Sequence, residues 1–203
     1  WVELLRSHGE AGGAEVRVPR AEFDETLEEM ERDVERLTKV AQRFSHVGSA
    51  PQLQLQDVTP VVIEAVQYMR RRLPRTEGEV VIRERYGEVP PINLNRELLA
   101  WALENLLTNA VSALDKKPGV IEVTVDRRKE TEAVEVTVTD NGRGMTPAEL
   151  KRAFEPGYTT KRRGWGLGLA MARRVVREYH GGRIFVRSSV PGQGTTVVIS
   201  FPT

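Results

Sequence analysis

The sequence predicts an α+β fold, a two-layer sandwich in which helices cover one face of a mixed β-sheet, preceded by a helical hairpin. Near the N-terminus, apolar residues repeat at alternating steps of four and three, a spacing typical of a helix packed on another helix. Beyond residue 58, segments with helical periodicity are interspersed with strand-like, β-branched segments. Short turns join several adjacent strand-like segments, which favours an antiparallel or mixed sheet over a doubly wound parallel one.

The heptad pattern in residues 23–44 predicts one long helix whose narrow apolar stripe must be buried against another helix. Its members are Phe23, Leu27, Met30, Val34, Leu37, Ala41 and Phe44. We expect a homodimer through this helix, although docking on its own domain would also bury the stripe. Residues 1–6 would end an earlier helix, and 8–19 would connect the two. We therefore expect a partial helical bundle over 1–50, a linker or first strand over 51–58, and a separate domain over 59–203.

The domain over 59–203 is expected to contain four helices and five strands, separated by glycine and proline breaks. In chain order, the apolar patterns predict a helix at 60–72, a strand at 79–86, a helix at 96–114, strands at 119–126 and 132–139, helices at 147–153 and 167–179, and strands at 183–189 and 195–201.

The composition excludes several classes of protein. Thirty Lys and Arg against 29 Asp and Glu give a formal charge of +1, so bulk charge does not suggest a nucleic-acid partner. The absence of cysteine excludes disulfides and thiolate metal sites and fits a reducing compartment. No apolar run approaches the roughly 20 residues of a membrane span, and residues 1–20 lack a signal-peptide pattern. We expect a cytoplasmic location, with an upstream membrane tether left open.

Two asparagines share one face of the helix predicted at 96–114. Asn105 and Asn109 lie four residues apart in the stretch ENLLTNA, so their amides point the same way. Amides in an otherwise apolar helix need polar partners, and a hydrated Mg²⁺ with phosphate oxygens would satisfy them. A capping or core hydrogen-bonding role is the structural alternative.

A strand runs directly into the glycine-rich turn DNGRGM at 140–145. Asp140 at the strand end could accept a hydrogen bond from the exocyclic amine of adenine, whereas guanine would present an oxygen there. Gly142 and Gly144 would let the backbone pass close to a flat base. Taken alone, such a sequence is more often only a turn.

The stretch GWGLGL opens the helix predicted at 167–179, with glycines at 164, 166 and 168. Free backbone N–H groups at a helix N-terminus suit phosphate, although this pattern is neither a dinucleotide-binding fingerprint nor a Walker A loop. Lys161, Arg162 and Arg163 precede it on a loop that could close over a triphosphate, or that is simply solvated. Thr195, at the entry to the last strand, could bind the base or an adjacent water.

These stretches resemble, in order and spacing, the N, G1, F and G2 boxes of sensor histidine kinases. They are ENLLTNA, DNGRGM, FEPGYTTK and GWGLGL. Residues from about 57 to 203 are similar to the ATP-binding domain of that family, whose superfamily includes gyrase, the Hsp90 chaperones and MutL. The segment 180–202 looks like the closing hairpin of the domain. The resemblance implies a mixed sheet with helices on one face, and ATP and Mg²⁺ as ligands.

The resemblance also implies roles for individual residues. Asn109 would hold Mg²⁺, Asp140 would take the adenine amino group, Lys161 would meet the phosphates, and 159–164 would form the ATP lid. The full set expected to bind nucleotide is Asn105, Asn109, Asp140, Gly142, Gly144, Met145, Thr159, Thr160, Lys161, Gly164, Gly166, Leu167, Gly168, Leu169 and Thr195.

The heptad helix resembles the second helix of the dimerisation and phosphoacceptor bundle, and residues 1–6 resemble the end of the first. The phosphorylated histidine of the family would then lie upstream of Trp1 and be absent from this chain. His8, His46 and His180 are poor substitutes, and no catalytic residue is assigned. Ser112 stands where many members carry a lysine that contacts phosphate, and Lys116 or Lys117 could compensate.

The resemblance therefore predicts the catalytic core of a two-component sensor histidine kinase. It would use Mg-ATP to phosphorylate a histidine for relay to an aspartate on a response-regulator receiver domain. This chain alone should bind ATP and ADP yet fail to phosphorylate itself. The alternatives are a degenerate kinase or regulatory module that binds nucleotide without transfer, and a dimeric scaffold with a vestigial pocket.

Overall fold

The computed structural model describes residues 51–73, 80–115, 118–161 and 164–203. The predicted heptad helix, its hairpin and the domain boundary at residue 50 lie outside these residues. The same holds for Lys116, Lys117, Arg162 and Arg163. Within the described residues, no helix is long and apolar enough to cross a membrane.

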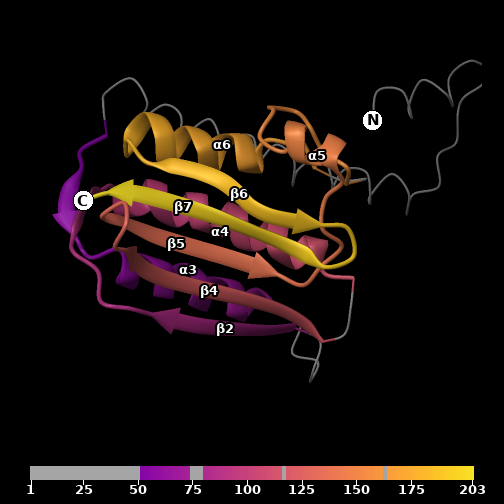
Figure 1. The fold of residues 1–203 in the computed structure, drawn as a ribbon, viewed down its shortest axis with the longest axis horizontal. Coiled ribbons are helices and arrows are strands. Elements are labelled where there is room, and N and C mark those ends of the chain that lie inside the picture. Colours follow the sequence, from indigo (N-terminus) through magenta and orange to yellow (C-terminus); the bar gives the residue numbers. More distant parts are fainter. Residues whose placement is uncertain (1–50, 74–79, 116–117, 162–163) are drawn as a thin grey trace, which may run out of the picture. The chain divides into compact units, whose positions relative to one another are not determined.

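A five-stranded mixed sheet forms one layer of the fold (Figure 1). Its order is β2-β4-β5-β7-β6, and its strands are β2 (Val80–Tyr86), β4 (Gly119–Arg128), β5 (Ala133–Asp140), β6 (Arg183–Val190) and β7 (Gly194–Pro202). Only β2 and β4 are parallel, and the other neighbours are antiparallel. This agrees with the short turns in the sequence, because hairpins join neighbouring antiparallel strands while a parallel pair needs a longer crossover.

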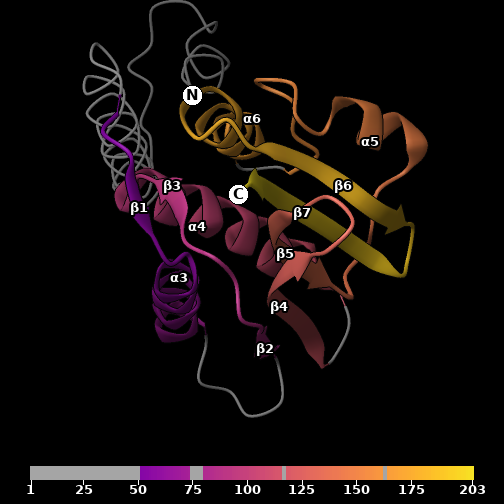
Figure 2. The ribbon, with the colours of Figure 1, turned by 60° about the vertical axis from the view of Figure 1, so that its left-hand side comes forward.

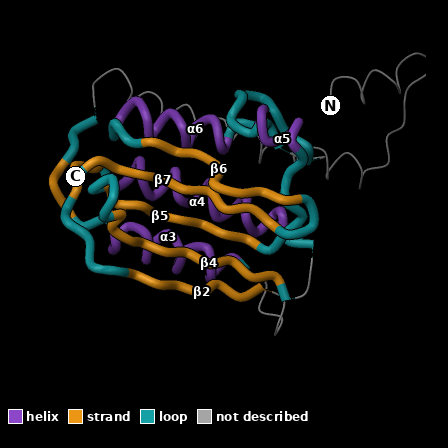
Figure 3. The backbone as a smooth tube through the Cα atoms, viewed as in Figure 1, coloured by secondary structure: helices purple, strands orange, loops and turns teal. Residues whose placement is uncertain are grey.

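Helices form the second layer, on one face of the sheet (Figures 2 and 3). They are α3 (Thr59–Arg72), α4 (Arg96–Ala113), α6 (Gly168–Arg174) and the π-helix η2 (Val175–Tyr179), while the short α5 (Pro147–Arg152) lies beyond the end of β5. The core contains the apolar faces of α3 and α4 and the alternate residues of β4, β5 and β7 that face them. The predicted fold class is confirmed.

A separate two-stranded antiparallel sheet precedes α4. It pairs β1 (Gln54–Gln56) with β3 (Ile92–Leu94). The sequence did not decide between a strand and a linker for residues 51–58, and it did not predict β3. The next residue, Asn95, caps α4, because its side chain accepts a hydrogen bond from the backbone N–H of Leu98 at 3.1 Å.

The helix predicted over 167–179 is α-helical only as far as Arg174 and continues as a π-helix. The buried His180 follows it, and both of its ring nitrogens are engaged. Nε2 accepts from the backbone N–H of Asn95 at 3.0 Å, and Nδ1 lies 2.8 Å from the backbone oxygen of Val175. These contacts fit a neutral ring with its proton on Nδ1, which joins η2 to the start of α4.

Stability should therefore fall as pH is lowered through the ordinary pKa of histidine, about 6.5. Burial lowers the pKa of His180 in the folded protein. As pH falls, the unfolded chain therefore binds the proton before the folded protein does. The stabilising contribution of neutral His180 is complete above pH 6.5 and is lost as pH falls towards the folded pKa. Urea unfolding at several values between pH 8 and 5 should show a steeper loss for the wild type than for His180→Gln. Parallel pH curves for the two proteins would contradict this role.

Candidate functional site

The predicted motifs converge where β5 ends, beside the C-terminal end of α4. The turn after β5 is tied to that helix, because the backbone N–H of Arg143 donates to the backbone oxygen of Ala113 at 2.9 Å. Asn141 fixes the other side of the turn, since its side-chain oxygen accepts from the backbone N–H of Val120 at 2.8 Å. Residues from a helix, a strand end and a turn therefore share one location.

Asp140 is a buried carboxylate at the last position of β5, 7% exposed. Oδ1 accepts from the backbone N–H of Gly142 at 2.9 Å, and the backbone N–H of Thr195 also donates to this carboxylate. Burial raises the pKa of Asp140, and these two hydrogen bonds oppose the rise. A buried carboxylate held by backbone donors is a fixed acceptor for a ligand N–H group.

Gly142 and Gly144 are required by close packing of the turn. A Cβ on Gly142 would lie 2.2 Å from the backbone oxygen of Ala113, and one on Gly144 would lie 2.1 Å from the backbone oxygen of Val190. Gly144 also has φ of +66°. The glycines thus let the turn pack directly on the end of α4 and on β6, a physical reason different from the predicted approach to a base.

A hydroxyl network links this turn to the last hairpin. Ser189 Oγ accepts from the backbone N–H of Met145 at 2.8 Å and lies 2.9 Å from Thr195 Oγ1. Thr195 is the β-ladder partner of Asp140 and is 8% exposed. Thr195 and Met145 were predicted from the sequence, whereas Ser189 was missed, because a serine in a strand carries no chemical pattern of its own.

The two asparagines of α4 lie against the glycine-rich start of α6. Asn105 Nδ2 donates to the backbone oxygen of Trp101 at 2.9 Å, within its own helix. A Cβ on Gly168 would lie 2.9 Å from Asn105 Oδ1 and 3.8 Å from Asn109 Nδ2. Gly168 therefore lets α6 approach α4 closely at the level of both amides.

Lys161 extends from the loop before α6 to Asn109. Its ammonium donates to Asn109 Oδ1 at 2.9 Å. The residue is exposed as a whole, yet desolvation lowers the pKa of its ammonium, and the charge of Arg143 lowers it further. The amide oxygen predicted to bind a metal ion thus already faces a cation.

The FEPGYTTK loop packs on the glycine-rich stretch that follows it. The backbone N–H of Gly157 donates to the backbone oxygen of Gly166 at 3.1 Å, and a Cβ on Gly166 would lie 2.5 Å from the backbone oxygen of Tyr158. Leu167 precedes α6 and its backbone oxygen accepts from the N–H of Met171, while Leu169 packs against the core. Gly164 and Thr159 are exposed, and no atom lies within 4 Å of a Cβ built on Gly164.

Arg143 bridges the β5 turn and the segment predicted to be a lid. Its Nη1 donates to Glu149 Oε1 at 3.0 Å, and its Nη2 donates to Thr160 Oγ1 at 2.6 Å. Glu149 is also a partner of Thr146 in the capping box of α5. Arg143 was not predicted from the sequence, although a basic residue inside a predicted binding turn is a signal that could have identified it.

Ser112 donates to the backbone oxygen of Thr108 at 2.7 Å and is exposed.

The donor set at the site fits Mg²⁺ only together with phosphate oxygens. Among the described residues, no three His, Cys, Asp or Glu side chains are grouped as a metal site. Asn109 Oδ1 is one hard oxygen ligand, and the ammonium now facing it shows that its lone pairs are available to a cation. Mg²⁺ commonly takes one or two protein oxygens, waters and substrate phosphates, so Asn109 is a suitable single protein ligand.

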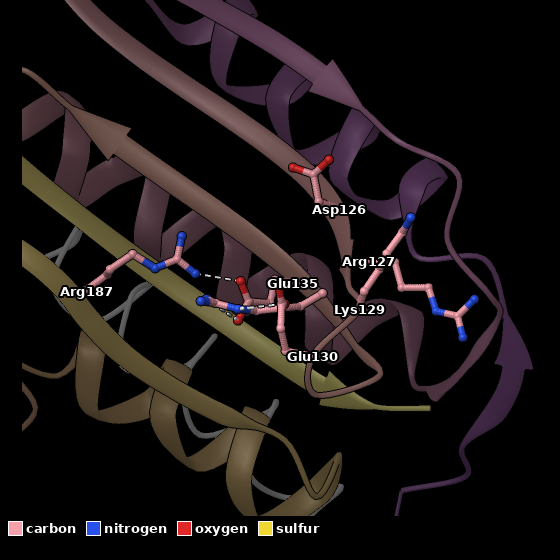
Figure 4. A pocket seen from close by; sticks show the side chains of 7 residues that line it. Asp126, Arg127, Lys129, Glu130, Glu135 and Arg187 are labelled. Atoms are coloured by element: carbon pink, nitrogen blue, oxygen red, sulfur yellow. Dashed lines mark hydrogen bonds and ion pairs between the residues drawn. The ribbon is translucent and has the colours of Figure 1, made fainter.

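A shallow depression of about 450 Å³ lies at the opposite end of the sheet, around the β4–β5 hairpin (Figure 4). Most of its charged side chains form ion pairs, either within the depression or with neighbouring residues. Glu135 accepts from Arg187 at 2.5 Å and lies 3.5 Å from Arg128, while Asp126 binds Arg85 at 2.9 Å. A solvated ion-pair cluster explains these residues without a ligand.

Comparison with known proteins gives one family match over the candidate site. The family described as histidine kinase-, DNA gyrase B-, and HSP90-like ATPase matches residues 95–203. Nitrogen regulation protein NtrY of Azorhizobium caulinodans is 29% identical over 191 residues, 91% of this chain and 24% of its own length. Sensor histidine kinase ZraS of Salmonella typhimurium is 31% identical over 190 residues, 89% of this chain and 38% of its own length. Signal transduction histidine-protein kinase AtoS of Escherichia coli is 38% identical over 121 residues, 60% of this chain and 19% of its own length.

Solved structures show the same fold. The mycobacterial sensor histidine kinase MprB has a TM-score of 0.60 at 27% identity and covers 74% of this chain and 97% of its own. Histidine kinase AdeS of Acinetobacter baumannii has a TM-score of 0.69 at 18% identity, with 99% and 94% covered. This chain spans well under half the length of NtrY, ZraS and AtoS.

Proposed function

Because the chain belongs to the histidine kinase-, DNA gyrase B- and HSP90-like ATPase family, we propose that residues 59–203 form the ATP-binding, phosphoryl-donating core of a two-component sensor histidine kinase. The γ-phosphoryl group of ATP would pass to a histidine, which the family resemblance puts upstream of Trp1. It would then pass to an aspartate on the receiver domain of a response regulator.

The observation that carries this proposal is that the four motifs contact one another at one location. The Lys161 ammonium meets Asn109 at 2.9 Å, and Gly168 packs on Asn105. The backbone N–H of Gly157 donates to the backbone oxygen of Gly166, and Arg143 of DNGRGM donates to Thr160. If each motif were only a turn or a cap, as the structural alternatives hold, nothing would require these segments to contact one another.

The residues of this chain would bind and orient the nucleotide rather than attack it. Asp140 would accept a hydrogen bond from the amino group of adenine, because its carboxylate is held by two backbone donors. Lys161 would move from Asn109 to the phosphates, where its charge would offset negative charge on the transferred group. Thr159, Thr160 and Gly164 would belong to the lid that closes over them.

Bound Mg²⁺ would supply positive charge to offset the negative charge of the nucleotide phosphates. Asn109 is its proposed protein ligand, and Asn105 would keep α4 and α6 in register through its contact with Gly168. Because Lys161 now faces Asn109 Oδ1, the ammonium and the metal ion cannot hold that oxygen together. Binding of the metal–nucleotide complex should therefore release Lys161 for contact with phosphate.

We further propose that the heptad helix of residues 23–44 forms a homodimer and that the kinase works in the cytoplasm. The sequence pattern supports the dimer, since a narrow a/d stripe needs a partner helix. The two-component role is supported by the sensor histidine kinases among the similar proteins. We propose residues 1–50 as part of the dimerisation bundle and 51–58 as the connection to the ATP-binding domain.

Phosphoryl transfer can be tested with a chain extended N-terminally through the first bundle helix. With γ-labelled ATP and Mg²⁺, the extended protein should acquire an acid-labile, alkali-stable label on histidine and pass it to a receiver domain. Binding of ATP with no label on any residue would favour the alternative, a degenerate kinase or regulatory nucleotide-binding module. A dimer that binds no nucleotide would instead favour the scaffold.

Replacing Lys161 should weaken ATP binding much more than AMP binding. A charged hydrogen bond contributes about 1.5–3 kcal/mol, so Lys161→Ala should lose about 10- to 100-fold in ATP affinity. AMP lacks the β- and γ-phosphates and should lose much less. Lys151→Ala, at an exposed position of α5, is the matched control and should bind both nucleotides normally. Equal losses for ATP and AMP in Lys161→Ala would contradict the assignment.

A further inference from the structure

Ser189 is joined to the candidate base-binding groups although it belongs to none of the predicted motifs. Its hydroxyl contacts Thr195 Oγ1 at 2.9 Å and accepts from the backbone N–H of Met145 at 2.8 Å. Thr195 in turn donates a backbone hydrogen bond to the Asp140 carboxylate. One side chain therefore connects the turn after β5, the last hairpin and the buried acid.

A β-bulge places Ser189 on this face of the sheet. Ile184 pairs with Ile199 and Val186 with Val197, so strict alternation from Val186 would put Ser188 on the same face. The irregularity between Val186 and Ser188 shifts the register by one residue, and Ser189 becomes the partner of Thr195. Ser188 pairs with Thr196 instead and is exposed.

The two hydroxyls carry two O–H groups, and their contact with each other uses only one of them, so one O–H group remains to donate. A hydroxyl has one donor and two acceptor sites. Either hydroxyl can donate across this contact; with Ser189 accepting from Met145 and donating to Thr195, the proton of Thr195 is left to face a ligand. Without Ser189, Thr195 would lose the partner that fixes its Oγ1, and its hydroxyl could turn to another acceptor.

We propose that Ser189 is a positioning residue for base recognition, which holds the Thr195 hydroxyl as a donor beside the Asp140 acceptor. The proposal rests on the proposed function of the site. Adenine presents an amino donor at C6 and an acceptor at the adjacent N1, and this edge complements an acceptor next to a donor. Guanine presents an oxygen and an N–H group at the same positions, so both of its groups would be mismatched.

The test compares ATP with 1-deaza-ATP, in which a C–H group replaces the N1 acceptor, by calorimetry in the presence of Mg²⁺. The wild type should prefer ATP by about 5- to 10-fold, the value of one hydrogen bond. In Ser189→Ala the preference should fall below about 2-fold. Ser189→Thr retains the hydroxyl and should restore the preference for ATP. Ser188→Ala, the neighbour on the opposite face, should keep the wild-type ratio.

The ratio separates positioning from general structural damage. A variant that is merely destabilised would bind both nucleotides more weakly and leave their ratio unchanged, and this result in Ser189→Ala would overturn the inference. Equal binding of the two nucleotides by the wild type would overturn it without any variant. Loss of the preference in Ser188→Ala would also overturn it, because the effect would then belong to the strand. A wild type that binds neither nucleotide would overturn the proposed function together with this inference.

Discussion

Asp140→Asn is expected to lower ATP affinity by about 100-fold or more while leaving the protein folded. The carboxylate can only accept hydrogen bonds, whereas an amide also carries an N–H₂ group. If that group faces the adenine amine, two donors oppose each other in a buried position. If the amide oxygen faces the amine instead, the backbone N–H groups of Gly142 and Thr195 lose part of the acceptor that now binds them.

The same change should maintain or raise the free energy of unfolding at neutral pH. Burial raises the pKa of Asp140 above its ordinary value of 3.8, so the folded protein holds the proton more tightly than the unfolded chain. The stabilising contribution of this group therefore falls as pH rises from 3.8 through the folded pKa. Above the folded pKa, the folded protein carries the full cost of burying the charge. Asn carries no charge and removes that cost.

Calorimetry and urea unfolding at pH 7.5 check both parts of this prediction. Asp126→Asn, which removes a partly exposed carboxylate paired with Arg85 at the far end of the sheet, is the control and should bind ATP as the wild type does. Full ATP affinity in Asp140→Asn would show that the carboxylate takes no part in base recognition. Lost affinity accompanied by unfolding would instead assign Asp140 a structural role.

Gly144→Ala should be strongly destabilising for a change that adds a single methyl group. An added Cβ would lie 2.1 Å from the backbone oxygen of Val190, which cannot move without shifting β6. Gly192, in the adjoining β6–β7 turn, has a similar φ of +76°, but a Cβ added there would meet no atom within 4 Å. The two substitutions share the cost of a left-handed residue, and only Gly144→Ala adds a steric overlap.

We expect Gly192→Ala to cost about 1 kcal/mol in the free energy of unfolding and Gly144→Ala to cost about 2 kcal/mol more, a typical penalty for overpacking. ATP binding should fall in Gly144→Ala alone, because Met145 and Ser189 would be pushed apart. Urea unfolding measures the first effect and calorimetry the second. Equal stability losses in the two variants would show that the turn can move away from β6.

The sequence predicted the helices and strands of the larger sheet because their apolar periodicity is long and unbroken. Strand β3 was missed because its three residues are too few to establish a period. The parallel pairing of β2 with β4 could not be predicted from the sequence either, because it depends on where α4 packs rather than on either strand alone. The π-helical turn before His180 likewise depends on tertiary contacts.

The site was predictable where a residue type is unusual for its local structure. Two asparagines in an apolar helix and an acid at a strand end are costly unless something binds them, so Asn105, Asn109 and Asp140 stood out. Ser189 and Arg143 did not, because serine and arginine are ordinary in strands and turns. Their contacts depend on a bulge and on loop packing, which the sequence does not display.

Titration of ATP into the wild-type protein, with and without Mg²⁺, tests the central claim most directly. If the four motifs form one nucleotide site, ATP should bind in the micromolar range, and Mg²⁺ should strengthen binding because Asn109 then contributes a metal ligand. No binding at millimolar ATP in either condition would contradict the account and leave the convergence of these motifs without a function.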